Sequence, residues 1–297
     1  MKLSQDTLAD YFSLPDSNRS IFLVGKMPYD FISRNSNTLV VTIGDSWTWG
    51  ADLTKLSFNG LHHNKLADDA DYRLANVFGG IVASSLHADF LNLGESGASN
   101  YYIANKLLEL SKIRESLEYT NIIVVCVFTE VARDFNGSDD SLIDYYSWLS
   151  SNINTHSDYY NLLKFINSNV TDKIVPLLNK FNIYFATNFV DPIGFENISQ
   201  HFLSKSWLQV WCEHKQIQYP EPCYVVSPWV FEKLEQALDI NPNLNRTNFL
   251  IWAADALASA NNRAAICKKD NVNFGNLLHP LAEGHRVWAQ YILEQIQ

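Results

Sequence analysis

The sequence predicts an α/β fold, a three-layer sandwich in which a parallel sheet of about five strands lies between helices. Two observations lead to this prediction. Segments with helical periodicity alternate along the chain with apolar segments, and the clearest apolar segments are unbroken runs rich in β-branched residues. Such runs are typical of parallel strands, because the crossover helices bury both faces of a parallel sheet. We therefore expect a doubly covered sheet with right-handed crossovers.

Five segments are the expected strands, in chain order. "TLVVTIG" at 38–44 comes first and "ADFLNLG" at 88–94 second. "NIIVVCVFT" at 121–129 is the clearest buried strand, and "NIYFATNF" at 182–189 is the fourth. "CYVVSP" at 223–228 is the fifth candidate. Each is short and rich in aliphatic or aromatic residues, as buried strands are.

Helical patterns lie between these strands. Residues 74–87 and 98–117 carry apolar side chains at helical spacing, and Ser99 or Asn100 is placed to cap the second pattern. The chain ends in an amphipathic pattern at 279–296. These patterns supply the helices that an α/β sheet needs on its two faces.

The chain of 297 residues contains no internal repeat and no obvious linker, so we expect one domain with insertions. Residues 1–37 are interpreted as an N-terminal extension packed on that domain, which then covers 38–297. Helical insertions are expected at about 135–180 and 195–265.

Composition and charge narrow the function classes. With 47% hydrophobic residues the chain can form a large core, and its net charge of −10 argues against nucleic acid as a partner. No apolar run reaches the length of a membrane helix, so no membrane partner is expected. The first residues lack the apolar core of a secretion signal, which predicts a cytoplasmic location, with a virion as the alternative. Whether the chain forms a homo-oligomer or joins a larger assembly stays open.

Metal and disulfide sites are not expected. The four cysteines have no C-x-x-C spacing and are interpreted as reduced thiols. His62 and His63 are adjacent in a polar segment, which is not a metal-binding pattern. The prediction is therefore a protein without a cofactor.

Residues able to carry chemistry follow the expected strands. Ligands of parallel α/β sheets bind outside the carboxyl ends of the strands, so polar residues at those ends can converge on one rim. Ser46 follows the first strand and is a candidate nucleophile, for which a histidine must act as base. His279 precedes the last helix and is the candidate base. The backbone N–H groups of Ser46 and Gly97 are candidate donors to an oxyanion.

These segments resemble the sequence blocks of the SGNH, or GDSL-type, hydrolases. "IGDSWTWG" resembles the first block, "NLGESGASN" the second and "GNLLHPLAEGH" the last. The resemblance extends from about residue 38 to the C-terminus and is specific only within these blocks. It implies a flavodoxin-like sheet and the cleavage of esters or acyl groups by a Ser-His pair, usually assisted by an Asp and without a metal.

The resemblance assigns roles to further residues. It places Gly97 as an oxyanion donor, and it places Asn276 at the acid position three residues before His279. Asn276 would orient the imidazole through its carbonyl oxygen, with a backbone carbonyl, Asp270 or Glu130 as alternatives. Glu130 stands where the family has an oxyanion-binding Asn.

A carboxylate such as Glu130 cannot donate a hydrogen bond unless it is protonated. We therefore expect Thr129 or a residue of another loop to supply a third oxyanion donor, unless there are only two donors. Asp45 is expected mainly to accept backbone N–H bonds at the turn and stays a secondary candidate for substrate contact. Of Trp47 and Trp49, one is expected to line the pocket and the other to pack in the core, with Trp47 as the candidate for substrate contact. His285 is expected to pack on the sheet.

Two functions follow as predictions. The first is a serine hydrolase that cleaves an O-acyl ester, such as an O-acetyl group, on a carbohydrate. The high number of Trp and Tyr residues is compatible with a glycan substrate, because sugar rings stack on aromatic faces. The alternative is a catalytically weakened glycan-binding or structural module, for example in a phage particle. The changes at Asn276 and Glu130 motivate this alternative.

Overall fold

The computed structural model describes part of the chain, namely residues 30–53, 70–129, 156–188, 190, 192–219, 265–267, 269–270, 274 and 279–296. Its centre is one sheet of five strands in the order β1-β3-β2-β4-β5. The strands are β1 (Asp30–Ile32), β2 (Thr38–Gly44), β3 (Asp89–Gly94), β4 (Asn121–Phe128) and β5 (Asn182–Thr187).

The sheet confirms the predicted fold class. Strands β3, β2, β4 and β5 are parallel to their neighbours, and only β1 pairs antiparallel, with β3. The four parallel strands match the expected segments closely. The fifth strand differs, because it comes from residues 30–32 of the expected N-terminal extension. The candidate at 223–228 lies outside the described residues.

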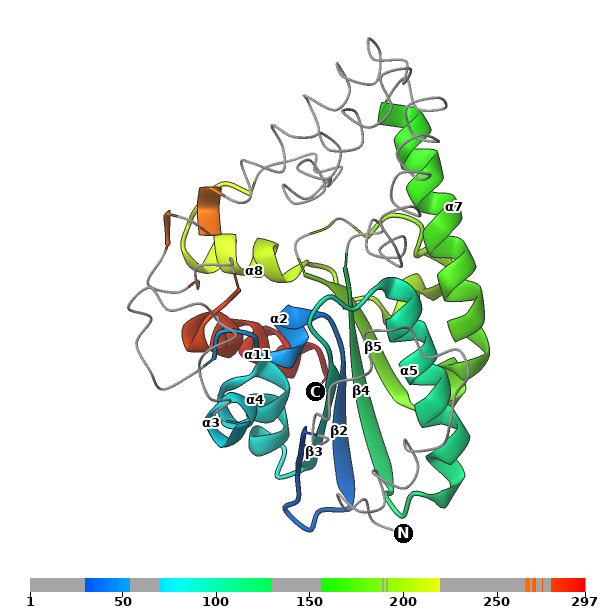
Figure 1. Ribbon diagram of the computed structural model, residues 1–297, viewed down its shortest axis with the longest axis vertical. Coiled ribbons are helices and arrows are strands. Elements are labelled where there is room, and N and C mark those ends of the chain that lie inside the picture. The colour runs from blue at the N-terminus through cyan, green and yellow to red at the C-terminus, as the bar shows by residue number, and fades with distance from the viewer. Residues whose placement is uncertain are drawn as a thin grey trace, which may run out of the picture.

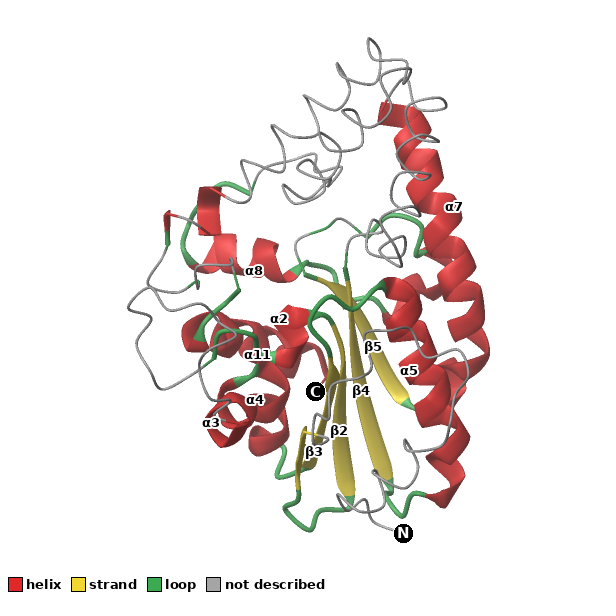
Figure 2. Ribbon diagram, in the orientation of Figure 1, coloured by secondary structure: helices red, strands yellow, loops and turns green. Residues whose placement is uncertain are grey.

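Helices cover both faces of the sheet (Figure 1). In the view of Figure 2, α5 and α7 lie on one side of the strands and α4 and α11 on the other. Along the chain the helices are α2 (Ser46–Trp49), α3 (Ala70–Asn76), α4 (Phe78–Ser85), α5 (Asn100–Ile113), α7 (His156–Ile174), α8 (Trp207–His214) and α11 (Ala282–Ile296).

The alternation of side chains along β2 explains why most of its residues are apolar. Leu39, Val41 and Ile43 belong to the core under α5 and α7, whereas Val40 belongs to the core under α4, α8 and α11. Since successive side chains of a strand point to opposite faces, a strand covered on both sides is apolar at most positions. The buried Thr42 hydroxyl is satisfied because it donates to Asn92 Oδ1 at 3.1 Å. The unbroken runs are therefore a direct consequence of the two helical layers.

Two helical segments depart from the expected boundaries. The pattern at 74–87 forms two helices, α3 and α4, which meet at Val77. Helix α7 falls within the expected insertion at 135–180, but it packs on α5 and connects β4 to β5. It is thus a crossover helix of the sheet. The expected cap is present, because the Ser99 side chain accepts from the Tyr102 N–H at 3.2 Å.

Among the described residues, no helix is both long and apolar enough to cross a membrane.

Candidate active site

Ser46 lies in a tight turn at the carboxyl end of β2. It is the first residue of α2, and Asp45 caps this helix by accepting from the Trp47 N–H at 3.0 Å. The helix ends after one turn at Gly50, which adopts a left-handed conformation with φ of 87°. The aliphatic strand therefore delivers the Ser46 hydroxyl at the edge of the sheet where ligands of such folds bind.

Two glycines allow the turn to approach the sheet. A Cβ atom on Gly44 would lie 2.1 Å from Thr48 Oγ1, and one on Gly94 would lie 2.5 Å from the Trp49 backbone nitrogen. Gly44 and Gly94 are paired in register on β2 and β3. Helix α2 can thus rest on the ends of both strands only because neither position carries a side chain.

The structure brings together Ser46 and His279, which are 233 positions apart. The distance from His279 Nε2 to Ser46 Oγ is 3.0 Å, which is hydrogen-bonding distance. Both residues are buried, with 3% of Ser46 and 9% of His279 exposed. His279 lies just before α11, as expected from the proline that follows it. The two side chains expected to act together are thus in contact, at the distance that a serine nucleophile and its base would need.

The other nitrogen of the His279 ring contacts an aspartate that the sequence analysis missed. His279 Nδ1 lies 3.1 Å from Asp52 Oδ2, and Asp52 is buried. Asp52 stands six positions after Ser46, two residues beyond the block "IGDSWTWG". Neither periodicity nor the resemblance marks this position, so only its proximity to Ser46 could have drawn attention to it. Asn276, the expected orienting residue, lies outside the described residues.

The two contacts of His279 favour one tautomer of its neutral ring. An ionised carboxylate only accepts hydrogen bonds, so the proton of the neutral ring belongs on Nδ1, facing Asp52. The lone pair of Nε2 then faces Ser46 Oγ and can accept its proton. The three side chains therefore form a chain of donors and acceptors in which Ser46 is the donor at the open end.

Asp45 supports the site from inside the protein. Its side chain is fully buried and accepts from the Trp47 N–H, from Thr129 Oγ1 at 3.0 Å and from Asn188 Nδ2 at 2.8 Å. Asp45 was expected mainly to accept backbone N–H bonds at the turn, and its contact with the Trp47 N–H agrees with this. A substrate contact would require exposure, which Asp45 lacks, so that secondary assignment was wrong.

Thr129 has the same supporting role, which corrects its assignment as an oxyanion donor. Its hydroxyl donates to Asp45, and its backbone N–H donates to Asn100 Oδ1 at 2.8 Å. Asn100 Nδ2 in turn donates to the Thr129 carbonyl oxygen at 3.0 Å. Both donors of Thr129 are therefore engaged within the protein. Glu130 lies outside the described residues.

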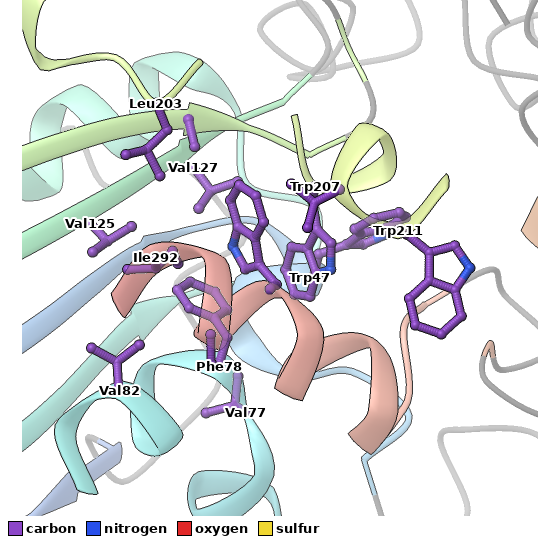
Figure 3. Packing of buried hydrophobic residues seen from close by; sticks show 14 of the residues in the cluster. Trp47, Val77, Phe78, Val82, Val125, Val127, Leu203, Trp207, Trp211 and Ile292 are labelled. Carbon is purple, nitrogen blue, oxygen red and sulfur yellow. The ribbon is translucent and has the colours of Figure 1, made fainter. Parts of the chain in front are cut away.

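Trp47 is a core residue, so its assignment to the pocket was also wrong. It is 5% exposed and packs edge-on against Trp207 with a centroid distance of 5.3 Å. Figure 3 shows it inside the cluster of buried side chains that includes Trp207 and Phe78. Trp49 is half-buried, and the Arg73 guanidinium lies over its ring at 4.3 Å.

Gly97 lies on the turn after β3, beside the turn that carries Ser46. The two turns are joined by the Glu95 N–H, which donates to the Gly44 carbonyl oxygen at 3.0 Å. Gly97 is exposed, has a φ of 81°, and would place a Cβ atom in open space. Its backbone is thus accessible next to the site, and its role as an oxyanion donor stays a prediction.

His285 packs behind the site, as expected. Its Nδ1 accepts from the Phe78 N–H at 3.3 Å, and its ring stacks on Phe78. Burial, together with the nearby His279, lowers the pKa of His285 to about 3. His285 is therefore a neutral part of the core. Among the described residues, no group of His, Cys, Asp and Glu side chains could hold a metal ion.

Comparisons with known proteins give matches among solved structures alone. No family model and no curated protein matches the chain. A member of the lipolytic protein G-D-S-L family from Veillonella parvula is 14% identical with a TM-score of 0.35, over 86% of this chain and 97% of that chain.

Two further matches are described as esterase and lipase. The acetylxylan esterase Axe2 from Geobacillus stearothermophilus is 13% identical with a TM-score of 0.30, over 87% of this chain and 93% of its own. An extracellular lipase from Streptomyces rimosus is also 13% identical, with a TM-score of 0.33, over 86% of this chain and 99% of its own. With similarity at this level, the functional interpretation depends on the site geometry.

Proposed function

We propose that the protein is a serine hydrolase that cleaves an ester bond. The observation that carries this proposal is the 3.0 Å contact between Ser46 Oγ and His279 Nε2, with a carboxylate at the far nitrogen of the same ring. A serine hydroxyl is a weak nucleophile until a base accepts its proton, and this arrangement supplies the base. The site lies at the carboxyl end of the parallel strands, where substrates of such folds bind.

The reaction would proceed in two halves. Ser46 Oγ attacks the acyl carbon while His279 Nε2 takes the hydroxyl proton, and the backbone N–H groups of Ser46 and Gly97 stabilise the oxyanion. His279 then returns the proton to the leaving alcohol, which departs and leaves an acyl-enzyme. In the second half, a water molecule attacks the acyl carbon while His279 takes its proton. The bond from the acyl carbon to Ser46 Oγ then breaks, His279 returns the proton to Ser46 Oγ, and the acid departs.

The substrate we propose is a small O-acyl ester, such as an O-acetyl group on a carbohydrate. Ser46 is only 3% exposed, which favours a small acyl group over a long chain. The chain also has 8 Trp and 14 Tyr residues, and aromatic faces suit sugar rings. Trp47 gives no support to a carbohydrate substrate, because its ring is buried in the core.

The binding-module alternative is less well supported. One of its motives was the Asn at position 276, where the resemblance places the acid that orients His279. Asp52 places a carboxylate 3.1 Å from His279 Nδ1 and removes this motive. Glycan binding that persists in Ser46→Ala, together with a wild-type protein that shows no turnover, would restore the alternative.

The test is hydrolysis of p-nitrophenyl acetate together with labelling by a fluorophosphonate probe. Wild-type protein should do both, and Ser46→Ala should lose labelling and at least about 10³-fold of its kcat/KM. Ser85→Ala is the matched control, because Ser85 is an exposed serine of α4. A folded wild-type protein that neither hydrolyses the ester nor reacts with the probe would contradict the proposal.

The acyl group is tested separately. Rates with p-nitrophenyl acetate, butyrate and octanoate should fall steeply with chain length, and O-acetylated oligosaccharides should release acetate. Faster cleavage of the octanoate than of the acetate would rule out the small-acyl proposal while leaving the serine hydrolase intact.

A further inference from the structure

We propose that Asp52 is the positioning acid of His279, so that the nucleophile and the acid come from one short turn. This inference rests on the proposed function and assigns a residue that neither the sequence pattern nor the family resemblance indicates. The resemblance places the acid in the segment that carries His279. In this chain the carboxylate that faces His279 Nδ1 comes instead from the turn that carries Ser46.

The contacts and burial at His279 carry the assignment. Asp52 Oδ2 is 3.1 Å from Nδ1, and Ser46 Oγ is 3.0 Å from Nε2, so the imidazole lies between the two side chains. Asp52 is 5% exposed and His279 9% exposed. Little water competes at such a site, and a charge-assisted hydrogen bond is stronger there than at the surface. The Asp52 carboxylate is thus placed to stabilise the imidazolium that forms when His279 accepts the serine proton.

Backbone hydrogen bonds fix Asp52 relative to Ser46. The Gly50 and Ala51 N–H groups both donate to the Ser46 carbonyl oxygen, at 3.1 and 2.9 Å. Asp52 follows in the left-handed conformation with φ of 68°, and the Leu53 N–H donates to the Gly50 carbonyl oxygen at 3.2 Å. The positive φ turns the chain so that the Asp52 side chain returns toward the start of α2. Seven consecutive residues, from Ser46 to Asp52, therefore provide both the nucleophile and the acid.

Two buried side chains, Arg73 and Asn92, hold the turn from Ser46 to Asp52 in place. Arg73 is 1% exposed and donates through its guanidinium to the Trp49 carbonyl oxygen at 3.2 Å. Asn92 on β3 donates to the carbonyl oxygens of Thr48 and Trp49 at 3.3 and 3.2 Å. These bonds anchor the turn to α3 and to the sheet. Of the three side chains Ser46, Asp52 and His279, His279 is therefore the one that comes from a separate part of the chain.

The proposed task of Asp52 is to hold the His279 ring in the tautomer that can act as a base. Asp52 accepts the Nδ1–H bond, which holds the ring in the tautomer whose Nε2 can accept the Ser46 proton. The proton of Nδ1 stays on the ring throughout, and Asp52 stays ionised. In serine proteases, replacing the corresponding acid by Asn lowers kcat by about 10⁴-fold, because the amide stabilises the wrong tautomer.

The substitution Asp52→Asn tests the proposal. Asn is nearly isosteric and tolerates positive φ, so the turn should persist. We expect kcat/KM for p-nitrophenyl acetate to fall by about 10²- to 10⁴-fold with little change in thermal unfolding. Retention of the wild-type rate would overturn the proposal.

Two matched variants complete the kinetic test. Asp71→Asn makes the same change at an exposed aspartate of α3 and should leave the rate unchanged. Asn276→Asp should neither raise the wild-type rate nor rescue Asp52→Asn. Rescue of Asp52→Asn by Asn276→Asp to the wild-type rate would assign the acid position to residue 276 and contradict the proposal.

A measurement that needs no turnover separates this inference from the proposed function. In Ser46→Ala protein, proton NMR should show a downfield imidazole N–H signal from the Asp52–His279 bond, which Asp52→Asn should remove. A wild-type protein without esterase activity would refute the proposed function, yet this signal would still report the Asp52–His279 contact. Absence of the signal while Asp52 is intact and the protein is folded would contradict the assignment.

Discussion

The Thr129 hydroxyl donates to Asp45 Oδ2 across 3.0 Å, although the two residues are 84 positions apart. The same carboxylate oxygen accepts from Asn188 Nδ2 at 2.8 Å. Asp45 follows β2, Thr129 follows β4 and Asn188 follows β5, and these strands are neighbours in the sheet. One buried carboxylate, on the residue before Ser46, therefore ties together the carboxyl ends of three adjacent strands.

Replacing Asp45 by Asn should destabilise the fold strongly. The amide NH₂ can no longer accept, so at least one of its former donors would face another donor inside the protein. We expect a loss of about 2–4 kcal/mol in the free energy of unfolding. Urea denaturation measures this, with Asp71→Asn as the exposed control. A loss below about 0.5 kcal/mol would show that the carboxylate does not hold the strand ends together.

Thr129→Val separates support from catalysis. The variant removes a buried hydroxyl but retains the shape of the side chain, so we expect a loss of about 1–2 kcal/mol in unfolding free energy. The kcat of the folded protein should change by only a few-fold, because both Thr129 donors are engaged within the protein. A hundredfold loss of kcat in a variant of normal stability would identify Thr129 as an oxyanion donor after all.

Alanine substitutions should distinguish Gly94, the last residue of β3, from Gly97 in the turn that follows. In Gly94→Ala the new Cβ atom would lie 2.5 Å from the Trp49 nitrogen, so α2 must move and Ser46 with it. We expect a loss of about 3 kcal/mol or more in stability, together with most of the activity. Gly97→Ala meets no atom, and its φ of 81° should cost about 1–2 kcal/mol. Equal losses in chemical denaturation of the two variants would contradict this distinction.

The sequence predicted the sheet well because the relevant signal is local. Burial on both faces makes most residues of β2 and β4 apolar, and such an apolar run is visible without knowledge of the fold. Ser46 and His279 could also be predicted from the sequence, since nucleophiles and bases follow strand ends and the short sequence blocks mark both positions. Their 3.0 Å separation is the consequence of placing both at one edge of the sheet.

Asp52 and Trp47 were harder to predict for physical reasons. The position of Asp52 beside His279 depends on a backbone turn with positive φ, which non-glycine residues adopt infrequently and no periodicity reveals. Trp47 follows Ser46 directly, but the helical turn points it to the opposite side, into the aromatic core around Trp207. Neighbours in sequence thus have different environments, and only the local backbone conformation decides between them.

The buried His285 should make stability depend on pH in the acidic range. Burial lowers its pKa to about 3, whereas the ring of an unfolded chain titrates near 6.5. The unfolded state therefore binds one more proton than the folded state between these values. It follows that this contribution to stability is complete above about pH 6.5 and is lost as the pH falls toward 3, at up to about 1.4 kcal/mol per pH unit.

The substitution His285→Asn tests this dependence, because the Asn side chain can still accept from the Phe78 N–H but does not titrate. The variant should be less stable at pH 7, since it loses the stack on Phe78. Its unfolding free energy should nevertheless fall less steeply than that of the wild type between pH 6.5 and about 3.5. His87→Asn is the matched control, because His87 is exposed and its φ of 51° suits Asn. Parallel pH profiles for the wild type and His285→Asn, measured by urea denaturation, would show that His285 takes up its proton without unfolding.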